Sequence, residues 1–183
     1  MKRRSFLKAT AALLSAAGLK EFALAQAAAV PATVQVHVVG AGQDCFGESH
    51  SRGYSNILFK VAARETDGGM FIIEHTNLIK GGPPLHLHLH QEEWFYVMEG
   101  VVLFQIGDNR NRLGSGESVL APRNIPHTFS SLGDKPGRLL IAFTPAGMME
   151  EFLRVTPAPN PPVQDAAFFR SYGMELIGPP LAV

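Results

Sequence analysis

The sequence predicts an all-β barrel or sandwich that ends in a short helical tail. Short runs of β-branched and aromatic residues recur along the chain, clusters of glycine and proline separate them, and helical periodicity is confined to the C-terminal region. The chain has 183 residues, of which 46% are hydrophobic and 17% are charged. This length and composition fit one globular domain with a substantial core.

Eight segments have the composition or the alternation of strands. The turns between them include Asp67-Gly68-Gly69 and residues 107–109, whose residue types adopt turn conformations readily. The predicted strands cover residues 33–39, 57–62, 70–75, 85–90, 94–105, 117–121, 128–132 and 138–143.

Two helices are predicted after the last strand. In the first, residues 146–155, apolar side chains recur on one face. In the second, residues 165–172, Asp165 is a suitable N-cap and Gly173 follows the C-terminal end. The proline-rich connector between them, residues 157–162, favours an extended and stiff conformation.

Residues 1–25 have the three regions of an export signal. A charged start precedes an apolar run over residues 9–19, and small residues form a cleavage site that ends at Ala25. The apolar run is too short to span a bilayer core of about 30 Å. The pair Arg3-Arg4 and the residues after it resemble a twin-arginine signal, which implies export of an already folded protein to the periplasm.

The charge balance argues against a nucleic-acid partner. The chain has 16 basic and 16 acidic residues, and no basic stripe follows the first eight residues. Cleavage after residue 25 removes five basic residues and one acidic residue, which leaves 11 basic and 15 acidic residues and a net charge of −4. We therefore expect neither a nucleic acid nor, after cleavage, a membrane as a partner.

The only cysteine is Cys45, so the chain has no intrachain disulfide and no cysteine-based metal cluster. A single cysteine is compatible with a small packing residue, with a reactive thiol or with a bridge to another chain. The sequence leaves these three roles open.

A histidine-rich segment contains the candidate chemistry. His86, His88 and His90 alternate with leucines, so on one strand their imidazoles would share a face. Neutral imidazole is the commonest side-chain metal ligand. Glu93 is out of phase with the histidines and joins them only if the chain turns within residues 89–92 and Glu93 lies on the next strand.

This segment resembles the first sequence motif of the cupin family. The motif consists of a glycine, a His-X-His pair, a glutamate after four further residues and a glycine after six more. His86, His88, Glu93 and Gly100 match this spacing, and Gly81 is displaced by one position.

A later segment resembles the second cupin motif, which contains a glycine, a proline and a metal-binding histidine. Gly116, Pro122 and His127 occupy these positions. Asn124 stands where the motif favours glycine, and Ser131 where it favours asparagine. Asparagine tolerates the left-handed backbone that the glycine would supply, so this departure leaves the predicted site intact.

The resemblance implies a cupin double-stranded β-helix, a jelly-roll barrel, over about residues 55–155. Residues 26–54 would then be a lead and an arm strand, and residues 156–183 a connector with a helical tail. By the same resemblance His86, His88, Glu93 and His127 would bind one divalent transition metal. Their nitrogen and oxygen donors suit iron, manganese, nickel, copper, cobalt or zinc. A barrel that keeps these residues without a metal is the alternative.

The chain is most similar to small bacterial cupins of the quercetin-2,3-dioxygenase-like group. This resemblance implies a small-molecule substrate, a hydroxylated aromatic or enol compound that chelates the metal, with Glu93 as the catalytic base. A non-catalytic protein that binds a small ligand or a metal, and a metal-dependent isomerase or lyase, remain as alternatives. The resemblance also implies a homodimer in which residues 33–39 pair with the partner's sheet.

Several further residues have open roles. His90 could lie near the metal, replace His88 or face solvent, and His75 could point into the barrel. Arg123 belongs either to the surface or to an anion-binding position at the barrel mouth. The side chains expected as cavity walls are Phe95, Val97, Leu103, Ile125, Phe129 and Phe143.

Overall fold

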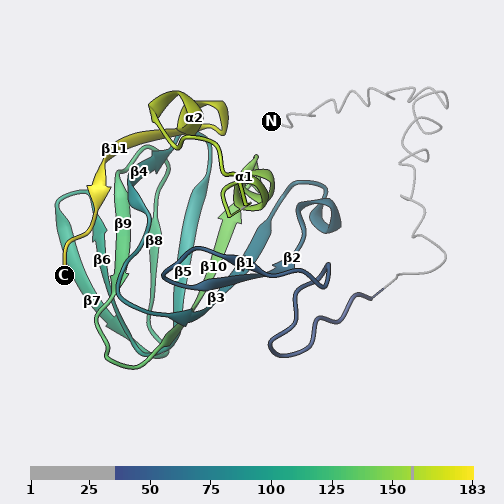
Figure 1. Ribbon diagram of the computed structural model, residues 1–183, viewed down its shortest axis with the longest axis horizontal. Helices are drawn as coiled ribbons and strands as arrows, with labels where there is room; N and C mark the ends of the chain where they lie inside the picture. The colour runs from purple at the N-terminus through teal and green to yellow at the C-terminus, as the bar shows by residue number, and fades with distance from the viewer. Residues whose placement is uncertain (1–35, 158) are drawn as a thin grey trace, which may run out of the picture. The chain divides into compact units, whose positions relative to one another are not determined.

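A computed structural model describes residues 36–157 and 159–183, and these residues form two packed antiparallel sheets (Figure 1). The strands are β1 (His50–Ser51), β2 (Asn56–Val61), β3 (Phe71–Leu78), β4 (Pro84–His88), β5 (Glu92–Glu99), β6 (Val101–Ile106), β7 (Asn109–Gly114), β8 (Ser118–Ala121), β9 (His127–Ser131), β10 (Gly137–Thr144) and β11 (Met174–Pro180). The helices are a 3-10 turn η2 (Ala63–Thr66), α1 (Met149–Val155) and α2 (Ala166–Ser171). The predicted export signal lies outside the described residues.

The strand order is that of a jelly roll, so the predicted fold class is confirmed. One sheet has the order β1-β2-β3-β10-β5-β8 and the other the order β11-β4-β9-β6-β7. The histidine-bearing strands β4 and β9 are neighbours in the second sheet, whereas β5, which carries Glu93, lies in the first. A site built from β4, β5 and β9 therefore joins the two sheets.

Strand alternation separates the core from the outer faces. On β5 the side chains of Glu93, Phe95 and Val97 are buried, whereas Trp94 is exposed. Trp94 pairs with Leu120 on the outside of β8, as its parity predicts. The core is rich in phenylalanine, and each fully buried side chain of this kind contributes about 1.5–3 kcal/mol. The fully buried phenylalanines are Phe59, Phe71, Phe95, Phe104, Phe143 and Phe169.

The predicted strand over residues 94–105 was wrong in one respect. It is two strands, β5 and β6, and Gly100 with φ 88° makes the turn between them. The predicted strand over residues 85–90 ends at His88. Residues 36–39, the described part of the predicted 33–39 strand, are irregular in the single chain, and residues 33–35 lie outside the described residues.

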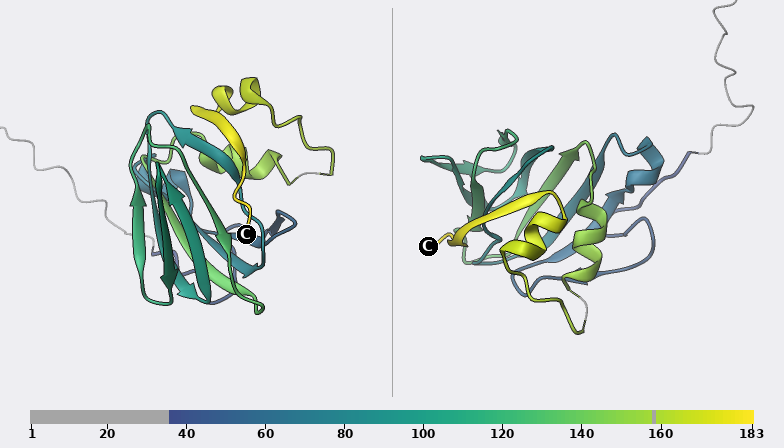
Figure 2. Two further views of the ribbon diagram at one scale, coloured as in Figure 1. Left: turned by 90° about the vertical axis from the view of Figure 1, so that its left-hand side faces the viewer. Right: turned by 90° about the horizontal axis from the view of Figure 1, so that it is seen from above.

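Both predicted helices are present, each a few residues shorter than expected. The Asp165 side chain accepts a hydrogen bond from the backbone N–H of Phe168, which confirms the N-cap of α2. Figure 2 shows α1 and α2 side by side, and Phe152 contacts Phe168 and Phe169 with ring centroids 5.6 Å apart. No helix within residues 36–157 and 159–183 is long and apolar enough to cross a membrane.

Replacing Gly82 by alanine is expected to destabilise the fold by about 1–3 kcal/mol. A Cβ atom at Gly82 would lie 1.8 Å from the carbonyl oxygen of Phe129, so β9 and the segment before β4 would have to separate. The matched control is Gly114→Ala, because a Cβ there meets only the flexible side chain of Glu117 at 3.7 Å. Urea unfolding measures both variants, and equal stability of the two would contradict this expectation.

Candidate metal centre

Four buried side chains meet between the two sheets: His86, His88, Glu93 and His127. One donor atom from each lies within 4.8 Å of the other three. His86 on β4 stands directly opposite His127 on β9, and their ring centroids are 4.7 Å apart. The turn after β4 then returns the chain in the facing sheet, which brings Glu93 against the histidines.

Backbone carbonyls orient two of the three imidazoles. The Nδ1 of His86 lies 2.8 Å from the carbonyl oxygen of Pro84, and the Nδ1 of His127 lies 2.9 Å from that of Ile125. A carbonyl oxygen can only accept, so Nδ1 carries the proton in each ring. The Nε2 of each ring is then the atom available to a metal ion, an arrangement typical of metal-binding histidines.

Gln91 orients the third imidazole. Its Oε1 lies 3.0 Å from the Nδ1 of His88, while its Nε2 donates to the carbonyl oxygens of Pro145 at 2.9 Å and Ala146 at 2.6 Å. The two carbonyls fix which end of the amide faces His88. Gln91 was predicted only as part of a turn, and its buried position next to the turn gives it this second role.

The carboxylate of Glu93 faces two imidazole nitrogens. Its Oε2 accepts a hydrogen bond from the Nε2 of His127 at 2.8 Å. The Nε2 of His88 lies 3.1 Å from the same oxygen but makes no hydrogen bond with it, so this buried nitrogen has no partner within the described residues. A metal ion at the centre would satisfy it, and the four residues fit such an ion by donor type and position.

The pKa values of His86 and Glu93 favour the unprotonated donor, whereas that of His127 favours the protonated one. Burial, together with the charges of the neighbouring imidazoles, lowers the pKa of His86 to about 3. Burial alone would raise the pKa of Glu93, but the imidazoles of His127 and His88 hold it below its usual range. Burial would lower the pKa of His127, and the bond to Glu93 raises it instead, so metal binding would displace a proton there.

The turn residues around the site behave as the second motif requires. Asn124 has φ 63°, the left-handed conformation expected at this position, and its N–H donates to the carbonyl oxygen of His88 at 2.7 Å.

His90 is exposed, because β4 ends before it. Arg123 is also exposed and binds both carboxylate oxygens of Glu92, at 2.5 and 2.7 Å, so it belongs to the surface.

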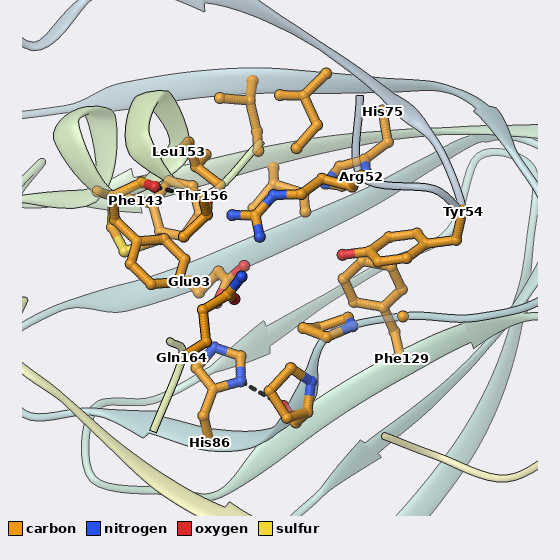
Figure 3. Close-up of a pocket in the computed structure, with 18 of the residues that line it drawn as sticks. Arg52, Tyr54, His75, His86, Glu93, Phe129, Phe143, Leu153, Thr156 and Gln164 are labelled. Atoms are coloured by element: carbon orange, nitrogen blue, oxygen red, sulfur yellow. Dashed lines mark hydrogen bonds between the residues drawn. The ribbon is translucent and has the colours of Figure 1, made fainter. Parts of the chain in front are cut away.

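A cavity of about 310 Å³ opens beside His86 and Glu93 (Figure 3). Two of the expected wall residues, Phe129 and Phe143, line it, whereas the other four do not. The walls are mainly apolar side chains from both sheets and both helices. They include Ile57, Ile73, Phe129, Ile141, Phe143, Met149, Phe152, Leu153 and Phe169.

The polar residues of the cavity wall from outside the motifs include Arg52, Tyr54 and His75. Burial raises the pKa of Tyr54 to about 12, so its hydroxyl keeps its proton. Burial and the charge of Arg52 lower the pKa of His75 to about 3, and the Nδ1 of His75 lies 2.6 Å from the Ser55 hydroxyl. Of these residues the sequence indicated only His75, because Arg52 and Tyr54 lie in an irregular segment without periodicity.

Cys45 lies away from this cavity and is half-buried against the core. Burial, with the nearby carboxylate of Asp44, raises the pKa of its thiol to about 11. The thiolate is the reactive form of cysteine. Of the open roles, packing is the one that this environment favours.

Acidification is expected to destabilise the metal-free protein through His75. Its folded pKa of about 3 lies below the ordinary value of 6.5, so between these values the unfolded chain binds a proton that the folded chain does not. The free energy of unfolding should fall by about 1.4 kcal/mol per pH unit for this group as the pH drops below about 6.5. Urea unfolding between pH 6.5 and 4.5 measures the slope. An unchanged slope in His75→Gln would contradict the assignment to this residue.

Comparison with known proteins agrees with the fold. Residues 77–143 match the family model Cupin_2, a cupin domain. Protein SchB from Streptomyces halstedii is 32% identical over 60 residues, which are 33% of this chain and 44% of SchB. The chain spans about half the length of the curated relatives that it matches.

Solved structures extend the likeness to most of the barrel. An RmlC-like cupin from Shewanella frigidimarina is 20% identical with a TM-score of 0.52, and the match covers 64% of this chain and 96% of that one. Oxalate decarboxylase from B. subtilis is 18% identical with a TM-score of 0.54, and the match covers 65% of this chain and 32% of that one. At these identities the likeness shows the fold alone. Residues 77–143 therefore match a cupin domain within a cupin-like fold, and the site is a buried His/Glu group that could hold a metal.

Proposed function

We propose that this protein is a periplasmic, metal-dependent dioxygenase that acts on a small hydroxylated aromatic or enol compound. The observation that carries the proposal is the buried group of His86, His88, Glu93 and His127 beside a cavity with aromatic walls. These four residues would hold an ion that a chelating substrate could also bind.

In this proposal the three imidazoles hold the ion through Nε2, and Glu93 is both a ligand and a base. When bound, a redox-capable metal lowers the pKa of a chelated hydroxyl group and allows reaction with dioxygen. Glu93 would take the hydroxyl proton, which requires that its carboxylate is not fully engaged as a metal ligand. Its buried position places it at the cavity wall, where the hydroxyl group of a substrate would lie.

The cavity walls support an aromatic substrate. Phe129, Phe143, Phe152 and Phe169 surround the space beside the donor atoms. Their rings provide apolar contact for a planar substrate and exclude water from the proton transfer. A volume of about 310 Å³ lies at the lower end of the range for ligand pockets, so we favour substrates with one ring.

The location and assembly are part of the same proposal. Loading the metal before twin-arginine export would protect a nitrogen-rich site from copper and zinc, which bind such sites most tightly. The expected homodimer would pair residues 33–39 with the partner's sheet.

Export of the unfolded mature chain tests whether the metal is loaded before export. If that chain acquired the same metal in the periplasm, loading before export would lose its support.

Metal analysis and oxygen uptake together test the function. The full chain is exported by its own signal, its metal content is determined, and oxygen uptake is recorded with a flavonol and catechol panel. One redox-capable metal ion per chain with substrate-dependent uptake supports the dioxygenase. Zinc or no metal, with no uptake, contradicts it.

A metal-dependent lyase or isomerase acting on a small acid is the second candidate. The observation that favours it is the guanidinium of Arg52, a basic group in the cavity wall. Product formation without oxygen uptake would separate this candidate from the dioxygenase. The fold likeness to oxalate decarboxylase adds no argument for the second candidate, because 18% identity shows the fold alone.

A further inference from the structure

Arg52 is a cationic side chain without an anionic partner in the cavity wall. Its Nε atom is buried and makes no hydrogen bond, and its side chain forms no ion pair within the described residues. A guanidinium keeps its charge in proteins, and a buried charge is costly unless it is paired. The carbon Cζ lies 5.2 Å from the ring centroid of Phe152, a contact that satisfies none of its N–H groups.

Two other half-buried arginines, Arg138 and Arg154, are paired. The buried carboxylate of Glu74 accepts two hydrogen bonds from Arg138, and Arg154 contacts both Glu48 and Glu150. Such pairing offsets the cost of removing a charge from water. Arg52 differs from these two arginines because it has no carboxylate partner within the described residues.

Tyr54, which lines the cavity beside Arg52, adds a hydrogen-bond donor, and the carboxylate of Glu93 lines the same cavity but forms no ion pair with Arg52. Figure 3 shows the guanidinium of Arg52 and the hydroxyl of Tyr54 pointing toward the space that His86 and Glu93 also face. The Tyr54 hydroxyl keeps its proton and can donate it. His75 stacks on the ring of Tyr54 with centroids 6.1 Å apart, is bonded to Ser55 and is neutral.

We propose that Arg52, with Tyr54, binds the carboxylate of an acidic substrate whose hydroxyl groups reach the metal centre. Arginine recognises carboxylates through two parallel hydrogen bonds. The phenylalanine rings that line the same cavity fit one planar ring of the substrate. This inference rests on the proposed function for the metal end of the substrate, and it narrows the substrate class to one-ring hydroxyaromatic or enol carboxylates.

Calorimetry with a matched pair of ligands tests the assignment. The full chain is loaded with Zn²⁺, which has no redox chemistry, so binding is measured without turnover. The probes are 3,4-dihydroxybenzoate and 3,4-dihydroxybenzamide, which share the ring and the chelating hydroxyls and differ in charge. The acid should bind more tightly than the amide, on the order of 10- to 100-fold. Arg52→Gln should remove this preference, mainly by weakening binding of the acid.

Two further variants separate recognition from a structural role. Arg123→Gln is the matched control, because Arg123 is exposed and bound to Glu92. The preference of this variant for the acid should equal that of the wild type. Arg52→Lys should retain part of the preference because the charge remains. The ligand-free Arg52→Gln variant should unfold at the same or a higher temperature, since it loses an unpaired buried charge.

Three results would overturn the assignment. The first is that the wild type binds the acid and the amide with equal affinity. The second is that Arg52→Gln weakens the affinity for both ligands equally. The third is that the unfolding temperature of ligand-free Arg52→Gln falls by a large amount. Absence of oxygen uptake would instead contradict the dioxygenase and leave the measured preference for the acid unaffected. The two proposals can therefore fail separately.

Discussion

Replacing Glu93 by glutamine should lower the turnover number by about 10²–10⁴-fold while the protein keeps much of its metal. Glutamine has the same shape, and its amide oxygen can still face the ion, but it cannot accept the substrate proton. The three imidazoles remain, each with its Nδ1 bonded as before. Metal content per chain and turnover number, measured on the same preparation, check this expectation.

The control for this variant is Glu92→Gln. Glu92 is the adjacent residue on β5, but its carboxylate binds Arg123 at the surface. We expect its metal content and its turnover to equal those of the wild type. If metal and turnover fell in equal proportion in Glu93→Gln, Glu93 would be a ligand only, and the role as a base would be lost.

Replacing Gln91 by leucine should weaken metal binding by about 10- to 100-fold. Leucine cannot accept the Nδ1–H of His88, so the ring is free to rotate or to change its tautomer. The carbonyl oxygens of Pro145 and Ala146 also lose their donor. Competition against a chelator of known affinity measures the change.

Gln105→Leu is the matched control, since the side chain of Gln105 accepts a hydrogen bond from Arg110 of β7 and is hydrogen-bonded to none of the four donor residues. Its metal affinity should equal that of the wild type. Unchanged affinity in Gln91→Leu would show that strand geometry alone orients His88.

The sequence predicted that these four side chains come together, because the spacing of the histidines follows the alternation of a strand. His86 and His88 share a face through alternation, and a turn before Glu93 is enough to bring the carboxylate into the facing sheet. The position of His127 came from the second motif, and the register of β4 against β9 places it opposite His86.

The missed strands have physical reasons. The strand β7 reads NRNRLG and is mostly exposed at a sheet edge, so it has no apolar alternation to detect. The strand β11 ends in Pro179-Pro180, which argue against a central strand but are tolerated at the edge that β11 occupies. Arg52 and Gln91 were missed because their roles depend on contacts between distant segments.

The four donor residues come from both sheets, and this affects how long a metal ion stays bound. Glu93 belongs to one sheet and the three histidines to the other, so an ion at the centre would act as a crosslink between the layers. Release of such an ion would require several buried donors to let go in turn, or the layers to separate. We therefore expect exchange against a free isotope of the same metal to be slow, with a half-life that shortens steeply under conditions that loosen the barrel.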